Sequence, residues 1–348
     1  MSASDPTRRG IDTLGIRDAT LALGPSLAAA VEIGEAIDHL PAGEDVANVL
    51  VVGMGADGLV GDVLHAVGDL FLPVPVTVAK GYDAPSFVGP DTFVVAVSHS
   101  GETEETLQAA EEAIQSGARL LAVTSGGTLA ELAGGENAAL ALVPDAPAAR
   151  TALGSMLAPP LLALERMGIF PGAHGWIDAA VDQLERRALQ LSSDRSPAAD
   201  LARRIGRTIP IVYGSGAVGR ATAARWKTQI NENAKAPAFA NFLSEVCHNE
   251  VAGWGQNGDL TRQVFQLVFL RHDEEHPRQA ERYRALETML EEVVGAVHQV
   301  EAEGDGALAQ ILDLVLYGDV VSLELAGQEG LDPGPVPAVD DLARMLEA

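Results

Sequence analysis

The sequence contains one strand, turn and helix pattern twice, and this repetition limits the fold more than any other feature. One copy is NVLVVGMGADGLVGDVLHAV, which begins at Asn48, and the other is IPIVYGSGAVGRATAARWKTQI, which begins at Ile209. Aligning Gly53 with Gly214 also superposes two further glycines and an alanine. A buried strand followed by a glycine turn and a helix is typical of α/β folds. The spacing of the two copies predicts two domains.

The length and the linkers of the chain agree with two domains. A chain of 348 residues is too long for one typical core. The polar stretch SSDRSPAAD lies between two helical regions, so we place the boundary near residue 195. Residues 1–194 then form a first domain with an N-terminal helical segment and connecting helices. Residues 195–348 form a second domain, whose proline-rich tail from Leu331 is expected to wrap across its surface.

Short apolar runs alternate with helical segments through the first half of the chain. Such alternation predicts a parallel sheet with helices on both faces. The second half repeats it less clearly, with a short strand expected near residues 238–242, an apolar run TRQVFQLVFLRH and a helix-rich region from Arg278 onward. We therefore predict an α/β fold for both domains.

The charge and the single thiol exclude several classes of protein. A formal charge of −26 disfavours nucleic acid and anionic membranes as partners. Cys247 is the only cysteine, so an intramolecular disulfide or a thiolate metal cluster cannot form. Acids or glycines interrupt every apolar stretch before it reaches the length of a membrane span. We expect a cytoplasmic protein.

Both glycine turns fit GxGxxG, so a nicotinamide site is one hypothesis. A dinucleotide site also needs an acid after the next strand, where this chain has Lys80. That disfavours a hydride-transfer enzyme. Close approach of strand and helix and a phosphate-binding role remain as two readings of the glycines.

The loop SHSGETEET concentrates hydroxyls between an apolar strand and a helix that is expected to start near Thr103. Free amides at a helix start and the helix dipole favour an anion. Ser98, Ser100, Thr103 and the amides around Gly101 could therefore hold a phosphate monoester. Ordinary N-capping would explain one hydroxyl but not three. The glutamates of this loop suit the dipole but oppose a bound anion unless they point away.

Two clusters of polar residues, NEN and HNE, lie sixteen residues apart. The first places Glu232 near the end of a helix that must stop before Pro237. The second places His248 after a short loop and strand. A carboxylate and an imidazole are the usual groups for moving protons near neutral pH. The other reading makes Glu232 a surface helix residue and His248 a satisfied core group.

The stretch HDEEH, residues 272–276, has two histidines at helical metal-ligand spacing. It lacks the HExxH order, and a proline follows it directly. We interpret it as a solvated turn, and we predict no metal site.

Several motifs together resemble a known family. The motifs VVGMG, SHSGETEET, PAARTALG, NENAK, HNE and LYGDVVSLELAGQEGLDPGPV occur in the order found in the bifunctional phosphoglucose/phosphomannose isomerases. The likeness covers nearly the whole chain. Proteins of that family consist of two flavodoxin-like sugar isomerase (SIS) domains.

The resemblance implies a reaction, a substrate and a set of residues. The reaction is the interconversion of fructose 6-phosphate with glucose 6-phosphate or mannose 6-phosphate through an enediol, without metal or cofactor, by a homodimer. Glu232 would move the proton between C1 and C2, His248 of the partner copy would open the ring, and Arg150 would steady the enediolate. The implied substrate-binding residues are Gly55, Ser98, Ser100 and Thr103.

This chain departs from the family pattern at five positions, which are Ala56, Asp57, Glu102, Gly334 and Ala343. The first three place two carboxylates where the family has small or neutral residues, which predicts weaker phosphate binding. The last two replace a Thr linked to mannose acceptance and a Lys linked to ring opening. The alternative is therefore a weak or inactive SIS protein that binds a sugar phosphate as a sensor or structural subunit.

Overall fold

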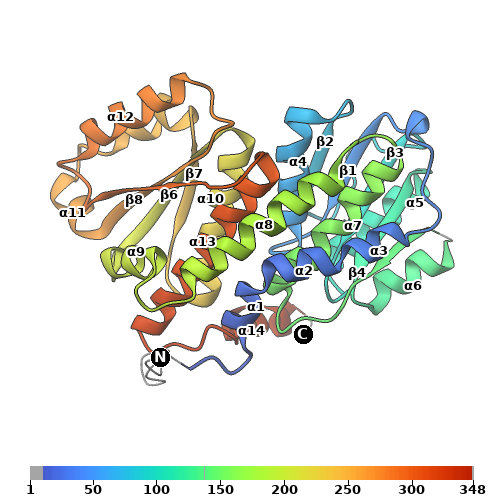
Figure 1. Ribbon diagram of the computed structural model, residues 1–348, viewed down its shortest axis with the longest axis horizontal. Helices are drawn as coiled ribbons and strands as arrows, with labels where there is room; N and C mark the ends of the chain where they lie inside the picture. The colour runs from blue at the N-terminus through green and yellow to red at the C-terminus, as the bar shows by residue number, and fades with distance from the viewer. Residues whose placement is uncertain (1–10, 137, 347–348) are drawn as a thin grey trace. The chain divides into compact units, whose positions relative to one another are not determined.

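The computed structural model describes residues 11–136 and 138–346, and these form two compact units. We call residues 22–186 and 303–313 the N-terminal unit, and residues 11–21, 187–302 and 314–346 the C-terminal unit. Each unit contains one parallel sheet flanked by helices (Figure 1), which confirms the predicted fold class. A domain boundary at residue 195 stays a prediction.

The N-terminal unit is built on a five-stranded parallel sheet in the order β2-β1-β3-β4-β5. Every residue of β3 is buried, because helices cover both faces of the sheet. The strands are β1 (Asn48–Val52), β2 (Val76–Ala79), β3 (Thr92–Val97), β4 (Arg119–Thr124) and β5 (Ala139–Leu142).

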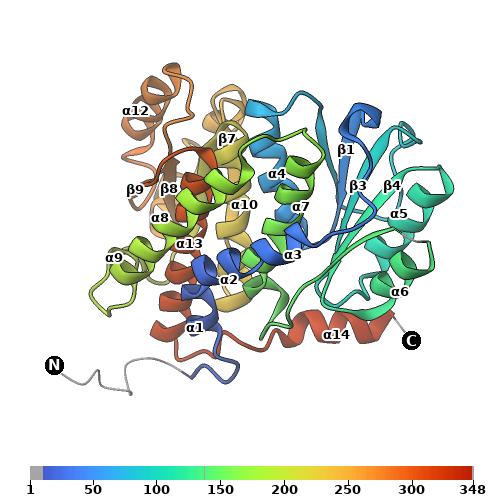
Figure 2. The same cartoon turned by 45° about the vertical axis from the view of Figure 1, so that its right-hand side comes forward.

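Helices pack on both faces of this sheet. One face holds α5 (Glu104–Gln115) and α6 (Gly127–Gly135), which pack on alternate strand residues such as Leu50 and Val94. The other face holds α4 (Gly58–Phe71) and α7 (Leu153–Arg166) (Figure 2). The remaining elements before the C-terminal sheet are α1 (Ile16–Leu21), α2 (Leu23–Ala29), α3 (Val31–Glu35), η1 (Gly43–Asp45), η2 (Ala149–Thr151), α8 (Ala173–Leu191) and α9 (Pro197–Ile205).

The C-terminal unit has a four-stranded parallel sheet in the order β7-β6-β8-β9. On one face, Tyr213 and Phe269 stack with ring centres 6.0 Å apart and pack against α12 (Arg278–Leu290). On the other face, Trp226 of α10 (Gly216–Asn233) donates to the carbonyl of Leu314 in α13 (Ala307–Gln328). The strands are β6 (Ile209–Ser215), β7 (Phe239–Leu243), β8 (Phe265–Arg271) and β9 (Val297–Glu301).

Two regions of the C-terminal unit differ from the sequence-based expectation. The apolar run that begins TRQV is helical at first, because α11 (Gly258–Val264) directly precedes β8. The region after Arg278 contains the edge strand β9 as well as helices, and the tail ends in α14 (Pro337–Leu346). Over residues 11–136 and 138–346, no helix combines the length and the apolar character needed to cross a bilayer.

Candidate active site

The strand order of the N-terminal unit reverses between β1 and β3, and we call this switch point the β1/β3 crevice. The chain leaves β1 toward β2 on one side and leaves β3 toward β4 on the other. In open parallel sheets, ligands bind at the carboxyl ends of strands where the order reverses in this way. The glycine turn after β1 and the serine loop after β3 both start at this point, since Val52 pairs with Ala96.

Backbone geometry explains why the turn after β1 is rich in glycine. Gly55 has φ +51°, in the left-handed region, and a Cβ there would meet no atom within 4 Å. A Cβ on Gly58 would lie 2.7 Å from the carbonyl oxygen of Gly53, so these two glycines allow helix and strand to approach closely. Lys80, which stands where a dinucleotide site needs an acid, binds Asp62 at 2.5 Å. The geometry therefore supports the close-approach reading of this motif.

The serine loop folds around its own hydroxyls. Ser98 is fully buried, accepts the Gly101 N–H at 3.1 Å and lies 2.9 Å from the Thr103 hydroxyl. Ser100 is exposed, and its hydroxyl accepts the N–H of Glu102 at 3.2 Å. Thr103 is the N-cap residue of α5, whose first-turn amides lack partners within the helix. The structure thus brings the three predicted hydroxyls to the start of one helix.

Two glutamates of this loop, Glu102 and Glu104, bind partners outside the helix start. The two carboxylate oxygens of Glu102 accept the backbone N–H of Thr128 at 2.8 Å and its hydroxyl at 2.9 Å. Glu102 therefore supplies negative charge to the first turn of α6, where the helix dipole favours it. Glu104 accepts the hydroxyl of Tyr82 at 3.3 Å, and burial, followed by this carboxylate, raises the pKa of Tyr82.

Asp57 is the acid that stays at the crevice. Its side chain is 91% buried, and its Oδ2 accepts the backbone N–H of His99 at 2.8 Å. The carboxylate thus lies between the glycine turn and the serine loop. It braces the loop, and it also adds negative charge to the region that is predicted to bind phosphate.

Arg150 belongs to the same unit. It lies in η2, which follows the carboxyl end of β5 and leads into α7. Its side chain is buried, unlike that of most arginines. A buried guanidinium is a fixed positive charge of the kind that stabilises a developing oxyanion.

Glu232 lies in the last turn of α10, in the C-terminal unit, and its neighbours in NENAK fix this turn. Asn231 donates to the carbonyl of Ala236 at 2.8 Å, and the buried Asn233 donates to the hydroxyl of Ser322 at 2.9 Å. Glu232 itself is half-buried. The hydrogen bonds of these two asparagines therefore restrain the backbone on both sides of Glu232.

Lys235 adds a further restraint at the end of α10. The sequence did not indicate this role. Lys235 has φ +52°, which is unusual for a residue with a side chain. Its Nζ donates to the carbonyls of Asn233 at 3.3 Å, Asp332 at 2.8 Å and Pro333 at 3.1 Å. Lys235 thus ties the C-terminal tail to the end of α10. No local sequence pattern indicates a contact over 97 residues.

His248 is exposed in η3 (Glu245–His248), beyond the carboxyl end of β7. The helix α10 precedes β7 in a parallel sheet, so Glu232 lies near the opposite, amino end of that strand. Five strand residues span about 16 Å. Within one chain, the structure therefore does not bring Glu232 and His248 together.

The stretch HDEEH forms the predicted turn, in which Asp273, Glu274 and His276 are exposed, but His272 is buried. Its Nε2 lies 2.9 Å from the carbonyl oxygen of Ser215, and burial lowers its pKa. Glu275 binds Arg271 instead of facing a metal. In the part of the chain that the structure describes, no three His, Cys, Asp or Glu side chains converge as metal ligands.

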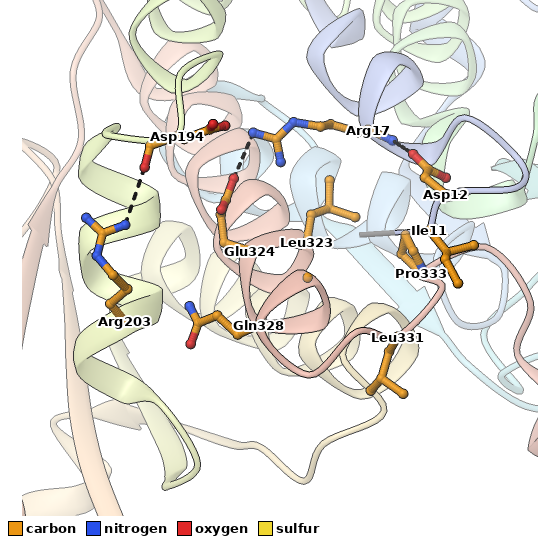
Figure 3. A pocket seen from close by; sticks show the side chains of 11 residues that line it. Ile11, Asp12, Arg17, Asp194, Arg203, Leu323, Glu324, Gln328, Leu331 and Pro333 are labelled. Atoms are coloured by element: carbon orange, nitrogen blue, oxygen red, sulfur yellow. Dashed lines mark hydrogen bonds and ion pairs between the residues drawn. The ribbon is translucent and has the colours of Figure 1, made fainter. Parts of the chain in front are cut away.

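A cavity of about 240 Å³ lies elsewhere in the C-terminal unit (Figure 3). Its two arginines have protein partners, since Arg17 pairs with Glu324 at 2.7 Å and Arg203 donates to the carbonyl of Asp194 at 3.3 Å. The lining residues are Ile11, Asp12, Arg17, Asp194, Arg203, Leu323, Glu324, Gly327, Gln328, Leu331 and Pro333. They include none of the predicted site residues.

Comparison with known proteins identifies the family. Residues 194–346 match the bacterial phospho-glucose isomerase C-terminal SIS domain, and residues 44–158 match the SIS domain. A bifunctional phosphoglucose/phosphomannose isomerase of Caldicellulosiruptor bescii is 33% identical over 91% of this chain and 94% of its own length. The chain belongs to the bifunctional phosphoglucose/phosphomannose isomerase family. The resemblance stated from the motifs is thereby confirmed.

Further similarities agree with this membership. A relative of the same name from Aquifex aeolicus is 34% identical over 86% of this chain and 90% of its own length. The C-terminal domain of glucosamine-fructose-6-phosphate aminotransferase from Francisella tularensis has the same fold, with a TM-score of 0.71 at 13% identity. It covers 92% of this chain and 98% of its own. At that identity, the likeness shows the fold alone.

Among the family departures, Gly334 has a structural partner. A Cβ at this position would lie 2.9 Å from Cγ of Leu14, so Leu14 fills the space beside it. The N–H of Gly334 donates to Asp332 at 2.9 Å. Ala343 is exposed on α14, and the neighbouring Arg344 pairs with Asp341.

Proposed function

We propose that this protein is a sugar-phosphate isomerase that interconverts fructose 6-phosphate with glucose 6-phosphate, mannose 6-phosphate or both. The observation that carries the proposal is the serine loop at the β1/β3 crevice, where three hydroxyls meet the start of α5. Glu102 binds the start of α6, and Glu104 accepts the hydroxyl of Tyr82, so both have partners outside that space. Family membership supports the same reaction.

In the proposed mechanism, phosphate binds the hydroxyls of Ser100 and Thr103 and the first amides of α5, while Ser98 braces the loop. A carboxylate at Glu232 takes the proton from C2 of the open-chain aldose and returns it to C1. The buried guanidinium of Arg150 stabilises the intervening enediolate. These steps are proton transfers and need no redox partner.

Ring opening requires a second group, which we assign to His248 of a partner copy in a homodimer. The observation in favour is that Glu232 and His248 of one chain lie at opposite ends of β7. An imidazole near neutral pH can give a proton to the ring oxygen as the bond to C1 breaks, while the O1 hydroxyl loses its own proton. We also place the protein in the cytoplasm, in agreement with its single thiol.

One observation favours the alternative, an SIS protein that binds sugar phosphate with little turnover. Asp57 keeps a buried carboxylate at the crevice, where it opposes phosphate. A chain with such a charge could retain weak binding while its turnover is lost.

A direct assay separates the two functions. With a chelator present, the purified protein should convert fructose 6-phosphate to glucose 6-phosphate, mannose 6-phosphate or both. Glu232→Gln should lower kcat by about 10²- to 10⁴-fold while still binding substrate in a thermal-shift assay, because it removes only the base. The exposed Glu281→Gln, on α12, is the matched control. Binding by wild type without turnover would establish the alternative instead.

A further inference from the structure

The turn that carries His248 is followed by a glutamate, Glu250, that is hydrogen-bonded to two strands of the sheet. Tyr213 of β6 donates its hydroxyl to Oε1 of Glu250, and Asn241 of β7 donates to Oε2 at 2.5 Å. We propose that Glu250 is a positioning residue that fixes the turn from which the His248 imidazole acts. The inference rests on the proposed function, in which His248 opens the sugar ring.

Apolar packing also restrains this turn, because the partly buried Cys247 and Val251 pack against the core of the unit. Val246 and Trp254 are buried in the same apolar cluster as Tyr213 and anchor the segment on both sides. Between them, His248 and Asn249 are exposed. Glu250 adds polar contacts to this packing, two residues after His248.

Hydrogen bonds within the turn connect Glu250 through Asn249 to Glu245, so they span His248. The Oδ1 of Asn249 accepts the N–H of Glu250 at 2.5 Å, and its Nδ2 donates to Glu245. Glu245 and His248 are the two ends of η3. A shift of the Glu250 carboxylate would therefore displace the backbone that sets the direction of the imidazole.

Residue 250 faces two hydrogen-bond donors, which favours a carboxylate at this position. Burial, followed by the Glu250 charge, raises the pKa of Tyr213, so its phenol stays a donor. Asn241 also donates, so both oxygens of Glu250 accept from internal groups. An amide at this position would turn an N–H toward one of the two donors. Because each oxygen accepts from an internal donor, we assign Glu250 a positioning role that acts through His248.

The proposal predicts a loss confined to ring opening. Glucose 6-phosphate must open its ring before Glu232 can act, and a displaced imidazole slows that step. Erythrose 4-phosphate cannot close a five-membered ring, because its O4 carries the phosphate. Its proton transfer between C2 and C1 uses Glu232 and Arg150 but not His248, and should be spared.

The test compares these substrates in the full-length protein. For Glu250→Gln, kcat on glucose 6-phosphate should fall about 10- to 100-fold, while proton exchange at C2 of erythrose 4-phosphate stays within about twofold of wild type. Tyr213→Phe should show the same pattern with a smaller loss. Glu292→Gln, which removes an exposed carboxylate after α12, should change neither rate.

Equal losses on the two substrates, or no loss on either, would overturn the inference. If Glu250→Gln does not fold, as judged by circular dichroism, Tyr213→Phe decides the question because it removes one hydroxyl. If wild type does not act on erythrose 4-phosphate, the kcat against pH profile on glucose 6-phosphate decides it. A shift along the pH axis of the limb assigned to the imidazole supports the positioning role. A kcat that is lower by the same factor at every pH contradicts it. A wild type without glucose 6-phosphate turnover would instead refute the proposed function.

Discussion

At the scale of single residues, Asp57 has two opposing effects on the crevice. Its carboxylate holds the His99 N–H at 2.8 Å and so supports the serine loop. The same charge repels a phosphate bound at that loop. Asp57→Asn keeps an oxygen for the hydrogen bond and removes the charge, which separates the two effects.

We expect Asp57→Asn to lower KM for fructose 6-phosphate about 5- to 30-fold, corresponding to about 1–2 kcal/mol. The value of kcat should stay within about twofold, because phosphate binding is shared by ground and transition states. Steady-state kinetics and inhibition by inorganic phosphate would measure the change. Asp69→Asn, at the far end of α4, is the control. An unchanged KM would mean that the Asp57 carboxylate does not repel the bound phosphate.

The sequence identified the hydroxyls of the serine loop because Ser98, Ser100 and Thr103 lie close together in the chain. It did not predict where Glu102 points, because its partner Thr128 lies 26 residues away at the start of another helix. The burial of His272 was missed for a similar reason. Its partner is the carbonyl of Ser215, on a different strand.

At the scale of elements, Lys235 links the helix that carries Glu232 to the C-terminal tail. Its ammonium group donates to two tail carbonyls, and Asp332 in that tail also accepts the hydroxyl and N–H of Thr13. Hydrogen bonds from a charged donor contribute about 1.5–3 kcal/mol each. We therefore regard Lys235 as the main restraint on residues 331–334.

Lys235→Gly should release the tail without straining the turn, since glycine accepts the φ of +52° readily. Exchange of the backbone amides of Leu331, Asp332 and Gly334 should rise by about tenfold or more, while α10 stays protected. Lys227→Ala, which removes an exposed lysine from the same helix, should leave the tail protected. Unchanged exchange in Lys235→Gly would show that other contacts hold the tail.

Elements with strong local patterns were predictable, and those without were not. The strands of the N-terminal sheet are continuous apolar runs, as expected when both faces are covered. β9 reads VHQVE and has one covered residue in five, so it carries no apolar run. α11 was missed because its TRQV continues directly into the apolar run of β8.

The duplicated fold does not duplicate the serine loop that is predicted to bind phosphate. Gly55 and Gly216 both have positive φ, and each turn brings its flanking glycines into close approach. In the C-terminal unit, however, β8 is followed by a buried His272 and three acidic residues, where β3 is followed by serines. The turn after β8 therefore has no equivalent of the serine loop.

At the scale of the whole molecule, the central claim is that one active site combines Glu232 of one copy with His248 of another. The separation of the two residues within one chain follows from topology, because α10 ends at the amino edge of its sheet and η3 follows the carboxyl edge. Their combination across two copies is our proposal. The motifs alone placed the two residues sixteen positions apart and could not indicate this separation. Only the strand direction does so.

Mixing two inactive variants tests this claim most directly. Glu232→Gln and His248→Ala should each be inactive alone, and their dimers should exchange after co-refolding or co-expression. In a mixed dimer, one site joins an intact Glu232 to an intact His248 from the other copy, so activity should recover to about a quarter of wild type. If each site were built within one chain, the mixture would stay inactive, and that result would contradict the account.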